Sequence, residues 1–476
     1  MSEDIAIILL LTCNISDSGV FSTNILKQSA EHDERVSYEG AQVYRANLRV
    51  PEDIVIVRNL LERGVISSMW SLSPTRADFL VRTEDTSVVR STLDSNRINH
   101  TLLVKNVQRR IDPDYVQSEL WTEQSLRIGE ILEIALQIFQ VVDYPCDQGF
   151  CLEVDTQISW VVGNLQSHRM SWDKYPSVGI INEYLKYLSD NFPSTCNVTT
   201  IGHSSRKRPI KAIRISNGNP NNKAFLITAG LHAREWVAIT SALYIANEII
   251  NNFDNQPHYV KDLDWYIVPL LNPDGYVYSQ TIDRFWRKNR RKFGICYGVD
   301  INRNFDIDWN VHGMTELNVC SESYSGPKAF SESESITLHD FLKRLPKIPS
   351  ALVDIHSYGQ QILYPWCART VETVNSDLHK STAAGMVESI YRVDQKLYKH
   401  GPAYHLMYPA PGAALDWAYK MGVNHSYAIE ARDKGTYGFL LPPAQILDTG
   451  KELFEGITYL ASVLHPKYKK QPSSWL

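Results

Sequence analysis

From about Ser171 onward, short β-branched runs alternate with segments of helical apolar spacing, and this alternation constrains the fold more than any other feature. Residues 224–230, 263–275, 350–357 and 424–431 are strand-like, and residues 234–253 carry one apolar helical stripe. The run at 263–275 ends in Pro-Asp-Gly, which predicts a turn. Strands alternating with helices indicate βαβ units. We therefore expect a large α/β domain around a mostly parallel sheet.

A smaller domain precedes it. Residues 41–47, 77–83 and 100–107 are strand-like, and residues 53–64 and 86–98 read as helices. This series of strand, helix, strand, helix and strand predicts a small α+β sandwich. The segment between the two domains has helical apolar spacing near 125–144 and the close pair Cys146 and Cys151, but it suggests no role.

The charge, the apolar runs and the cysteine spacing of the chain argue against several classes of function. The chain of 476 residues has 48 lysines and arginines against 53 acidic residues, a formal charge of -5, which argues against nucleic acid as a partner. It has no run of about 20 apolar residues, so no membrane span is expected. The seven cysteines lack the paired CxxC spacing of a thiolate zinc site.

The evidence for secretion is mixed at this level. The run Ile5 to Leu11 has the length of a signal-peptide core but follows acidic rather than basic residues, so a buried strand or a mis-assigned start is equally open. Four N-x-S/T sequons would suit a glycosylated secreted chain, although sequons also arise by chance; they stand at Asn14, Asn99, Asn197 and Asn424.

Polar side chains follow several of the expected strands. His232 and Glu235 stand three apart at a strand-to-helix junction, and His356 follows another strand. Two histidines and a carboxylate leave a fourth tetrahedral position for water, as in catalytic zinc sites. Taken alone, the His-x-x-Glu spacing more often marks a salt bridge at a helix start, because short motifs recur by chance. Because ligands in open α/β sheets bind beyond the carboxyl ends of strands, these residues and Glu430 could converge there.

A set of longer motifs is more specific, comprising HAREW, NPDGY, RFWRKNRR, DINRNFD, DIHSYGQ, ALDWAY and IEARDKGTYGFLLP. Over residues 171–465 the chain resembles the carboxypeptidase A/B family of zinc metallocarboxypeptidases. The resemblance implies a mixed, largely parallel sheet with helices on both faces, preceded by a ferredoxin-like propeptide that shields the active site until proteolysis. The expected parts are a leader at 1–36, a propeptide at 37–110, an atypical connection at 111–170 and a catalytic domain at 171–470.

The resemblance also implies roles for individual residues. One zinc ion per chain would be bound by His232, Glu235 and His356. Glu430 would take a proton from the attacking water and deliver it to the leaving amine. Taken alone, Glu430 could equally pair with Arg432 at a strand end.

Charged and polar groups would hold the substrate. By resemblance, Arg287 stabilises the oxyanion, and Asn302 and Arg303 grip the terminal carboxylate, with the arginine making two parallel hydrogen bonds. Tyr408 would close over that carboxylate and Arg234 would add positive field. The plain alternative for each arginine is a surface cation.

Leu415 aligns with the position that sets substrate preference, where basic-residue enzymes of the family usually have an acidic residue. Leucine predicts an apolar pocket, because a substrate lysine or arginine would be left desolvated and unpaired. Cys367 stands where glycine is usual and Ala428 where threonine is common, which leaves the pocket size open. The family disulfide would join Cys296 to Cys320 and indicates an oxidising compartment.

Together these features predict a secreted, monomeric zinc carboxypeptidase zymogen that removes apolar or aromatic C-terminal residues from peptides and proteins. A trypsin-like protease would activate it at Arg109, Arg110 or Arg169. The alternative is a non-catalytic peptide-binding protein that retains the fold. The segment at 111–170 could be a real insertion that covers the site or an error in the gene model.

Overall fold

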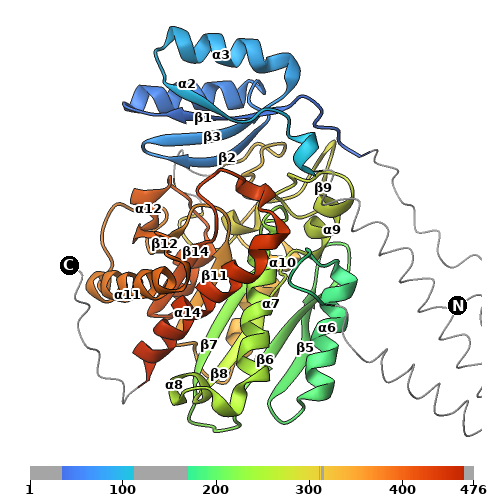
Figure 1. The fold of residues 1–476 in the computed structure, drawn as a ribbon, viewed down its shortest axis with the longest axis vertical. Helices are drawn as coiled ribbons and strands as arrows, with labels where there is room; N and C mark the ends of the chain where they lie inside the picture. The colour runs from blue at the N-terminus through green and yellow to red at the C-terminus, as the bar shows by residue number, and fades with distance from the viewer. Residues whose placement is uncertain (1–34, 112–169, 310, 312–315, 466–476) are drawn as a thin grey trace, which may run out of the picture. The chain divides into compact units, whose positions relative to one another are not determined.

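The computed structural model describes residues 35–111, 170–309, 311 and 316–465 (Figure 1). Residues 1–34 of the expected leader, most of the connection at 111–170, and with it Cys146, Cys151 and Arg169, lie outside these residues. Within the described residues, no helix has both the length and the apolar character that crossing a membrane requires.

The small domain contains a four-stranded antiparallel sheet in the order β2-β3-β1-β4, with two longer helices. Its elements are β1 (Gln42–Asn47), α2 (Pro51–Glu62), β2 (Ser68–Ser73), β3 (Arg76–Val81), η1 (Thr83–Asp85), α3 (Thr86–Ser95) and β4 (His100–Val104). Alternate residues of β1 and β3 face the helices, as Tyr44 and Phe79 do with Val57 and Leu93 in one buried cluster. The sequence series of three strands was incomplete, because it omitted β2.

The large domain is built on an eight-stranded sheet in the order β13-β12-β14-β11-β7-β8-β6-β5. The four central strands, β14, β11, β7 and β8, are parallel to one another, and β12 is parallel to β13. Three pairs are antiparallel: β5 with β6, β6 with β8, and β12 with β14. The strands are β5 (Cys196–His203), β6 (Pro209–Ile215), β7 (Lys223–Ala229), β8 (Leu263–Val268), β11 (Ala351–His356), β12 (Gln361–Tyr364), β13 (Lys399–Pro402) and β14 (His425–Glu430). The expected mixed, largely parallel sheet is confirmed.

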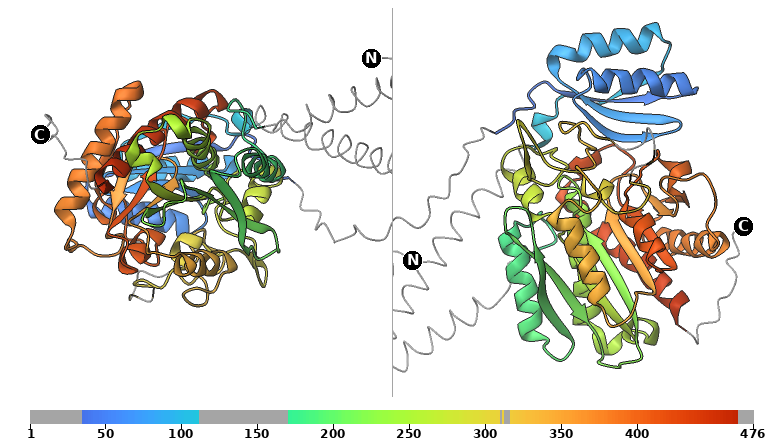
Figure 2. Two further views of the ribbon diagram at one scale, coloured as in Figure 1. Left: turned by 90° about the horizontal axis from the view of Figure 1, so that it is seen from below. Right: turned by 180° about the vertical axis from the view of Figure 1, so that it is seen from behind.

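Helices cover both faces of this sheet (Figures 1 and 2). The α-helices are α6 (Val178–Asn191), α7 (Trp236–Asn251), α8 (His258–Lys261), α9 (Pro273–Thr281), α10 (Ser333–Arg344), α11 (Ser376–Asp394), α12 (Ala403–Leu406), α13 (Ala414–Lys420) and α14 (Ile446–Leu464). The shorter elements are η2 (Phe253–Asn255), β9 (Lys292–Phe293), β10 (Cys296–Tyr297), η3 (Ile301–Arg303), η4 (Gly438–Leu440) and η5 (Pro443–Gln445).

The large domain has a hydrophobic core on each face of its sheet, and the alternation of side chains along the strands explains both. Successive side chains of a strand point to opposite faces, so in β7 Phe225 and Ile227 pack with α7 and α14, whereas Leu226 packs with α10 and α13. In Figure 1 α7 and α14 lie in front of the sheet, and the rear view in Figure 2 shows the opposite face. A sheet buried on both faces leaves its strand ends as the place where polar groups can gather.

One local prediction was wrong. The Pro-Asp-Gly segment after β8 is the first turn of α9 rather than a turn that closes a strand. The Asn272 side chain accepts the Gly275 N–H at 2.9 Å and caps the helix, and Pro273 occupies its first position, where no N–H is needed. β8 itself ends five residues before that proline, at Val268.

Candidate active site

Three parallel strands bring the candidate ligands and base to one edge of the sheet. β7 leads into the segment that carries His232 and Glu235 just before α7, and β11 ends at His356. β14 ends at Glu430, which is paired in register with His356. Residues almost 200 positions apart in the chain thus meet at adjacent carboxyl ends, as expected of an open α/β sheet.

His232, Glu235 and His356 form a buried cluster that could hold a metal ion, with one ligand atom from each within 4.8 Å of the others. Glu235 Oε1 lies 2.7 Å from His232 Nδ1, and Glu235 Oε2 lies 2.9 Å from His356 Nδ1. The two Nδ1 atoms face each other at 3.2 Å. Burial opposes ionisation of Glu235, but the two histidines hold its pKa well below the usual value.

Each histidine has a second carboxylate behind it. Asp300 Oδ1 lies 3.2 Å from His232 Nε2, and Asp354 Oδ2 lies 2.7 Å from His356 Nε2. If both Nε2 atoms carry the ring proton toward these carboxylates, the two Nδ1 lone pairs point at one another. Such an arrangement needs a cation between them, so the donor set fits a metal ion of zinc type.

Asp300 joins this cluster to Arg287. Arg287 Nε and Nη2 donate to Asp300 Oδ2 at 2.9 and 2.8 Å. Burial by itself would raise the pKa of Asp300, but Arg287 and other nearby cationic groups hold it well below its usual range. The guanidinium is therefore held in one orientation beside the metal-binding cluster, with Nη1 4.0 Å from Glu235 Oε1.

Asp300 also positions the residues expected to bind the terminal carboxylate of the substrate, Asn302 and Arg303, called here the clamp. Asp300 Oδ1 accepts the Asn302 N–H at 3.0 Å at the start of η3, which carries Asn302 and Arg303. Arg303 Nη2 donates to the Tyr408 hydroxyl at 2.9 Å, so the arginine and the expected mobile tyrosine are already together. Asn302 Oδ1 accepts the Ala414 N–H at 2.8 Å, which ties the clamp to the start of α13.

Leu415 belongs to a buried apolar cluster next to that clamp, called here the apolar pocket cluster. Its members come from β12, β14, α12, α13 and the adjoining loops, and are Leu363, Cys367, Ala403, Ala413, Leu415 and Ala428. Leu415 directly follows the clamp-bound Ala414. Cys367 and Ala428, which the resemblance assigned to pocket positions, lie in the same buried cluster as Leu415.

A buried carboxyl group, that of Asp416, lies against the apolar pocket cluster and accepts hydrogen bonds from its backbone. Asp416 accepts the Cys367 N–H at 2.8 Å and the Ala368 N–H at 3.3 Å. Burial raises the pKa of Asp416 to about 7, although these hydrogen bonds oppose the shift. Burial and Asp416 also raise the pKa of the Cys367 thiol well above its usual value, so the thiol is neutral and apolar.

Glu430 lies within the electrostatic reach of the metal-binding cluster. Burial is the main cause that raises its pKa, to about 8, and the nearby Glu235 adds to the effect while His356 and Arg287 oppose it. Gly359 leaves room for it, since a Cβ atom there would lie 3.2 Å from Glu430 Cβ. The carboxyl group is therefore suited to exchange a proton near neutral pH in this setting.

Arg234, which was expected to add positive field near the substrate, is bound by the small domain. Its guanidinium donates to Ser68 Oγ and to the Met69 carbonyl, both at 3.0 Å, so it is bound by strand β2 of the small domain. Trp70 of the same strand packs against the rings of Phe285 and Phe439. The strand that the sequence series omitted thus contacts the large domain.

Two more contacts join the small domain to the site. The Tyr358 hydroxyl donates to Asp78 Oδ2 at 3.1 Å, two residues beyond His356 in the chain. Asp78 also pairs with Arg45, whose Nη2 donates to the Lys434 carbonyl at 2.6 Å. Tyr408 packs against the hydrophobic core of the small domain.

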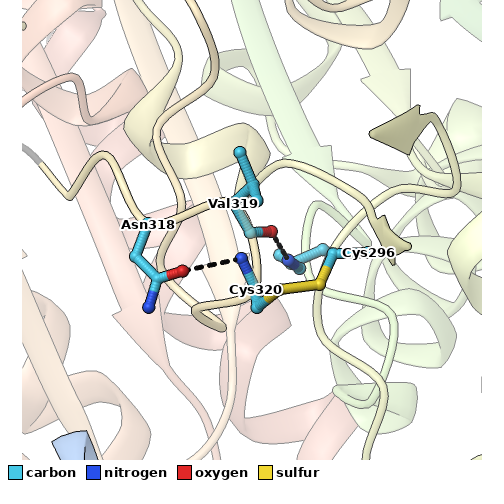
Figure 3. The surroundings of a disulfide bond; sticks show 5 residues. Cys296, Asn318, Val319 and Cys320 are labelled. Atoms are coloured by element: carbon cyan, nitrogen blue, oxygen red, sulfur yellow. Dashed lines mark hydrogen bonds between the residues drawn. A yellow bond between two sulfur atoms is a disulfide. The ribbon is translucent and has the colours of Figure 1, made fainter. Parts of the chain in front are cut away.

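The expected disulfide is present. Cys296 and Cys320 are bonded, with Cα atoms 5.3 Å apart, and Asn318 accepts the Cys320 N–H through its side chain (Figure 3). Among the described residues, Cys196 and Cys367 are buried thiols outside any disulfide. The bond closes the loop that separates the Arg287 segment from Glu322, a partner of Arg234 at 3.2 Å.

Comparison with known proteins agrees with this geometry. The zinc carboxypeptidase model matches residues 181–456, and the carboxypeptidase activation peptide model matches residues 44–114. The chain belongs to the zinc carboxypeptidase family. It is a zinc metallocarboxypeptidase with an activation domain, as the sequence motifs predicted.

Its relatives differ in their reported activities. The chain is similar to human carboxypeptidase B, with 29% identity over 437 residues covering 89% of this chain and 93% of that protein. Mouse carboxypeptidase A2 is 38% identical over 283 residues, covering 58% of this chain and 67% of that protein. An inactive metallocarboxypeptidase, ecm14, of Talaromyces marneffei is 35% identical over 326 residues, covering 62% of this chain and 54% of that protein.

Among solved structures, thrombin activatable fibrinolysis inhibitor matches with a TM-score of 0.74 and 26% identity, covering 90% of this chain and 99% of that one. The likeness therefore includes both the small and the large domain.

Sequence reasoning did not single out Asp300 and Asp354, although each opens a motif that it quoted, DINRNFD and DIHSYGQ. The spacing of Asp354 and His356, two residues apart in an expected strand, could have predicted that they interact. In a strand, residues two apart share a face, so an acidic residue two positions before a candidate ligand histidine can reach its ring. Asp300 offered no such local signal, because His232 lies 68 residues away.

Proposed function

We propose that this carboxypeptidase is secreted as a zymogen and, once activated, removes apolar or aromatic residues from the C-termini of peptides. The observation that carries the substrate preference is Leu415 in the apolar pocket cluster, joined to the clamp through the hydrogen bond between Asn302 and Ala414. A terminal carboxylate held by the clamp directs the last side chain toward this cluster. Burying a leucine or phenylalanine side chain there is worth about 1.5 to 3 kcal/mol.

The metal site supports hydrolysis. His232, Glu235 and His356 would hold the zinc ion, which supplies Lewis-acid chemistry by lowering the pKa of water and polarising a carbonyl. Glu430 accepts the proton of the attacking water and passes it to the leaving amine nitrogen. Arg287, fixed by Asp300, donates to the oxygen that becomes negative at the scissile carbonyl.

The clamp explains why the last residue is removed. The Arg303 guanidinium can make two parallel hydrogen bonds to the terminal carboxylate, and Asn302 adds a further donor. Tyr408 lies on Arg303 and can cover the bound carboxylate once its contact with the small domain is released. An internal peptide segment has no carboxylate for this clamp.

Inhibition by the small domain is supported by its contacts at the site. β2 engages Arg234, Asp78 engages Tyr358 and the core of the domain packs on Tyr408. Of the two expected cleavage sites that the structure describes, Arg109 is exposed, whereas Arg110 donates to the Thr436 carbonyl at 2.8 Å. Arg109 is thus the more accessible to a trypsin-like protease.

Secretion is supported by the disulfide between Cys296 and Cys320, since such bonds persist in oxidising compartments. The domain limits of 37–110 and 171–470, a monomeric state and the leader at 1–36 stay predictions. Reduced Cys296 and Cys320 thiols in protein isolated from its source, under conditions that trap thiols, would contradict an oxidising location.

The test is release of the last residue from matched peptides ending in phenylalanine, leucine, lysine or glutamate, before and after limited trypsin treatment. We expect release of phenylalanine or leucine only after trypsin, with loss of activity on zinc chelation. A Glu430→Gln variant purified in parallel controls for contaminating peptidases. Preference for lysine would contradict the pocket assignment, and full activity before trypsin would contradict zymogen control.

The same assay tests the non-catalytic alternative. Every residue expected to act is present here, from the three metal ligands to Glu430 and Arg287, whereas a protein that only binds peptides has no need to keep them all. If cleaved, zinc-loaded protein binds peptides but releases no residue, the alternative is supported and the proposed catalysis is wrong.

A further inference from the structure

Asp354 is the buried carboxylate that lies behind His356. It lies on β11, 1% exposed, two residues before His356 and therefore on the same face of the strand. One carboxylate oxygen, Oδ2, lies 2.7 Å from His356 Nε2. The other, Oδ1, accepts the Thr228 hydroxyl at 2.7 Å.

The position of Thr228 makes this pair part of the sheet. Thr228 and Asp354 are register partners on the parallel strands β7 and β11. Both strands lead to candidate metal ligands, β7 to His232 and β11 to His356. Since both oxygens of Asp354 are engaged, rotation of the carboxylate would break at least one buried hydrogen bond.

The two ring nitrogens of His356 have different surroundings. Nδ1 faces Glu235 and His232, at 2.9 Å from Glu235 Oε2, whereas Nε2 faces Asp354. A neutral imidazole carries one proton, so a hydrogen bond donated from Nε2 leaves the Nδ1 lone pair free for a metal ion.

We propose that Asp354 is a positioning residue that fixes the ring of His356 with Nδ1 toward the metal, and that Thr228 holds Asp354 in place. The proposal rests on His356 being a zinc ligand, as in the proposed function. Asp354 acts through His356 and does not touch substrate.

Asp300, the carboxylate behind His232, differs from Asp354 in its other contacts. Asp300 also binds Arg287 and the Asn302 N–H, so its loss would disturb the oxyanion arginine and the clamp together. Asp354 contacts Thr228 and His356 instead. Its substitution therefore separates metal affinity from the other functions of the site.

The experiment measures the zinc dissociation constant of the full chain by competition with a chelating indicator. For Asp354→Ala we expect binding about 10- to 100-fold weaker than in the unchanged protein. Asp354→Asn and Thr228→Val should show smaller losses of several-fold, because each keeps part of the arrangement. The visible spectrum of the cobalt-substituted protein should change in Asp354→Ala, since it reports the geometry of the ligands directly.

Asp264→Asn is the matched control. Asp264 is a carboxylate on β8 that binds Arg214 and Ser216 away from the metal ligands, so its loss should lower stability without changing zinc affinity or the cobalt spectrum. Unchanged zinc affinity and an unchanged cobalt spectrum in Asp354→Ala would overturn the proposal. If Asp354→Ala does not fold, unchanged values in both Asp354→Asn and Thr228→Val would overturn it. Failure of the unchanged protein to bind zinc would instead overturn the proposed metal site itself.

Discussion

The active site has two halves that are held together by different forces. In the polar half, around His356 and Arg287, the charged groups are fixed by hydrogen bonds to named partners, with Asp300 serving both the metal cluster and the arginine. In the apolar half, around Leu415 and Cys367, side chains are held by packing. Directed charge interactions fail abruptly when one partner is lost, whereas packing responds gradually to volume. The polar half should therefore decide whether the enzyme works, and the apolar half which residue it removes.

The largest effect should come from Glu430→Gln. The amide cannot accept the proton of water, so kcat on a leucine-ending peptide should fall about 10²- to 10⁴-fold. Zinc content should stay unchanged, because Glu430 is not among the three candidate metal ligands. Glu388→Gln on α11, where the carboxylate pairs with Arg392, is the control and should keep full activity. Wild-type turnover in Glu430→Gln would remove it from the mechanism.

Arg287→Ala should have the next largest effect. Loss of the donor to the developing oxyanion should lower kcat about 10²- to 10³-fold, with Arg287→Lys retaining part of the activity because it keeps the charge. The control is Arg214→Ala, which breaks an exposed ion pair with Asp264. An effect confined to KM would show that Arg287 binds substrate without stabilising the transition state.

Leu415→Asp tests the apolar half. A carboxylate in the pocket should pair with a substrate lysine, and the kcat/KM ratio of lysine-ending to leucine-ending peptides should rise about 100-fold. The matched control is Leu415→Asn, which is polar but uncharged and should not create a preference for lysine. An unchanged ratio in Leu415→Asp would mean that the last side chain does not enter this cluster.

Cys367→Gly should have a smaller effect on the same preference. Removing this buried side chain enlarges the pocket, so the kcat/KM ratio of phenylalanine-ending to leucine-ending peptides should rise about tenfold. Cys367→Ser preserves the volume and should leave the ratio close to that of the unchanged protein. Equal ratios in all three proteins would contradict a limit on pocket size at this position.

The last prediction concerns stability, and it rests on the buried carboxyl group of Asp416 beneath the apolar half. Because the pKa of Asp416 is raised by burial from 3.8 to about 7, the folded state keeps the proton that the unfolded state has lost. This group's contribution to the free energy of unfolding should thus fall as pH rises from about 4 to 7, by at most about 1.4 kcal/mol per pH unit. Asp416→Asn should remove that dependence.

Denaturant titrations of the two proteins at several pH values measure the difference. If the free energy of unfolding depends on pH in the same way in the unchanged protein and in Asp416→Asn, the carboxyl group is not protonated in the folded state.

Much of this molecule could be read from local patterns. Runs such as 350–357 and 424–431 predicted strands, and their polar ends predicted where His356 and Glu430 would lie, because chain direction and side-chain alternation follow from backbone geometry alone. The same reasoning failed at Asn272, where a side-chain cap turned an apparent strand end into a helix start.

The sequence by itself determined the fold class, the family, and the residue types available for metal binding, proton transfer and substrate preference. Only the tertiary structure decided that Asp300 serves both His232 and Arg287, that Asp354 and Thr228 form a pair behind His356, and that β2 binds Arg234. Motifs record neighbours along the chain, whereas these contacts join residues 13 to 166 positions apart. Strand register and domain packing bring such residues together, and both arise from burial of the whole apolar surface rather than from any local run of residues.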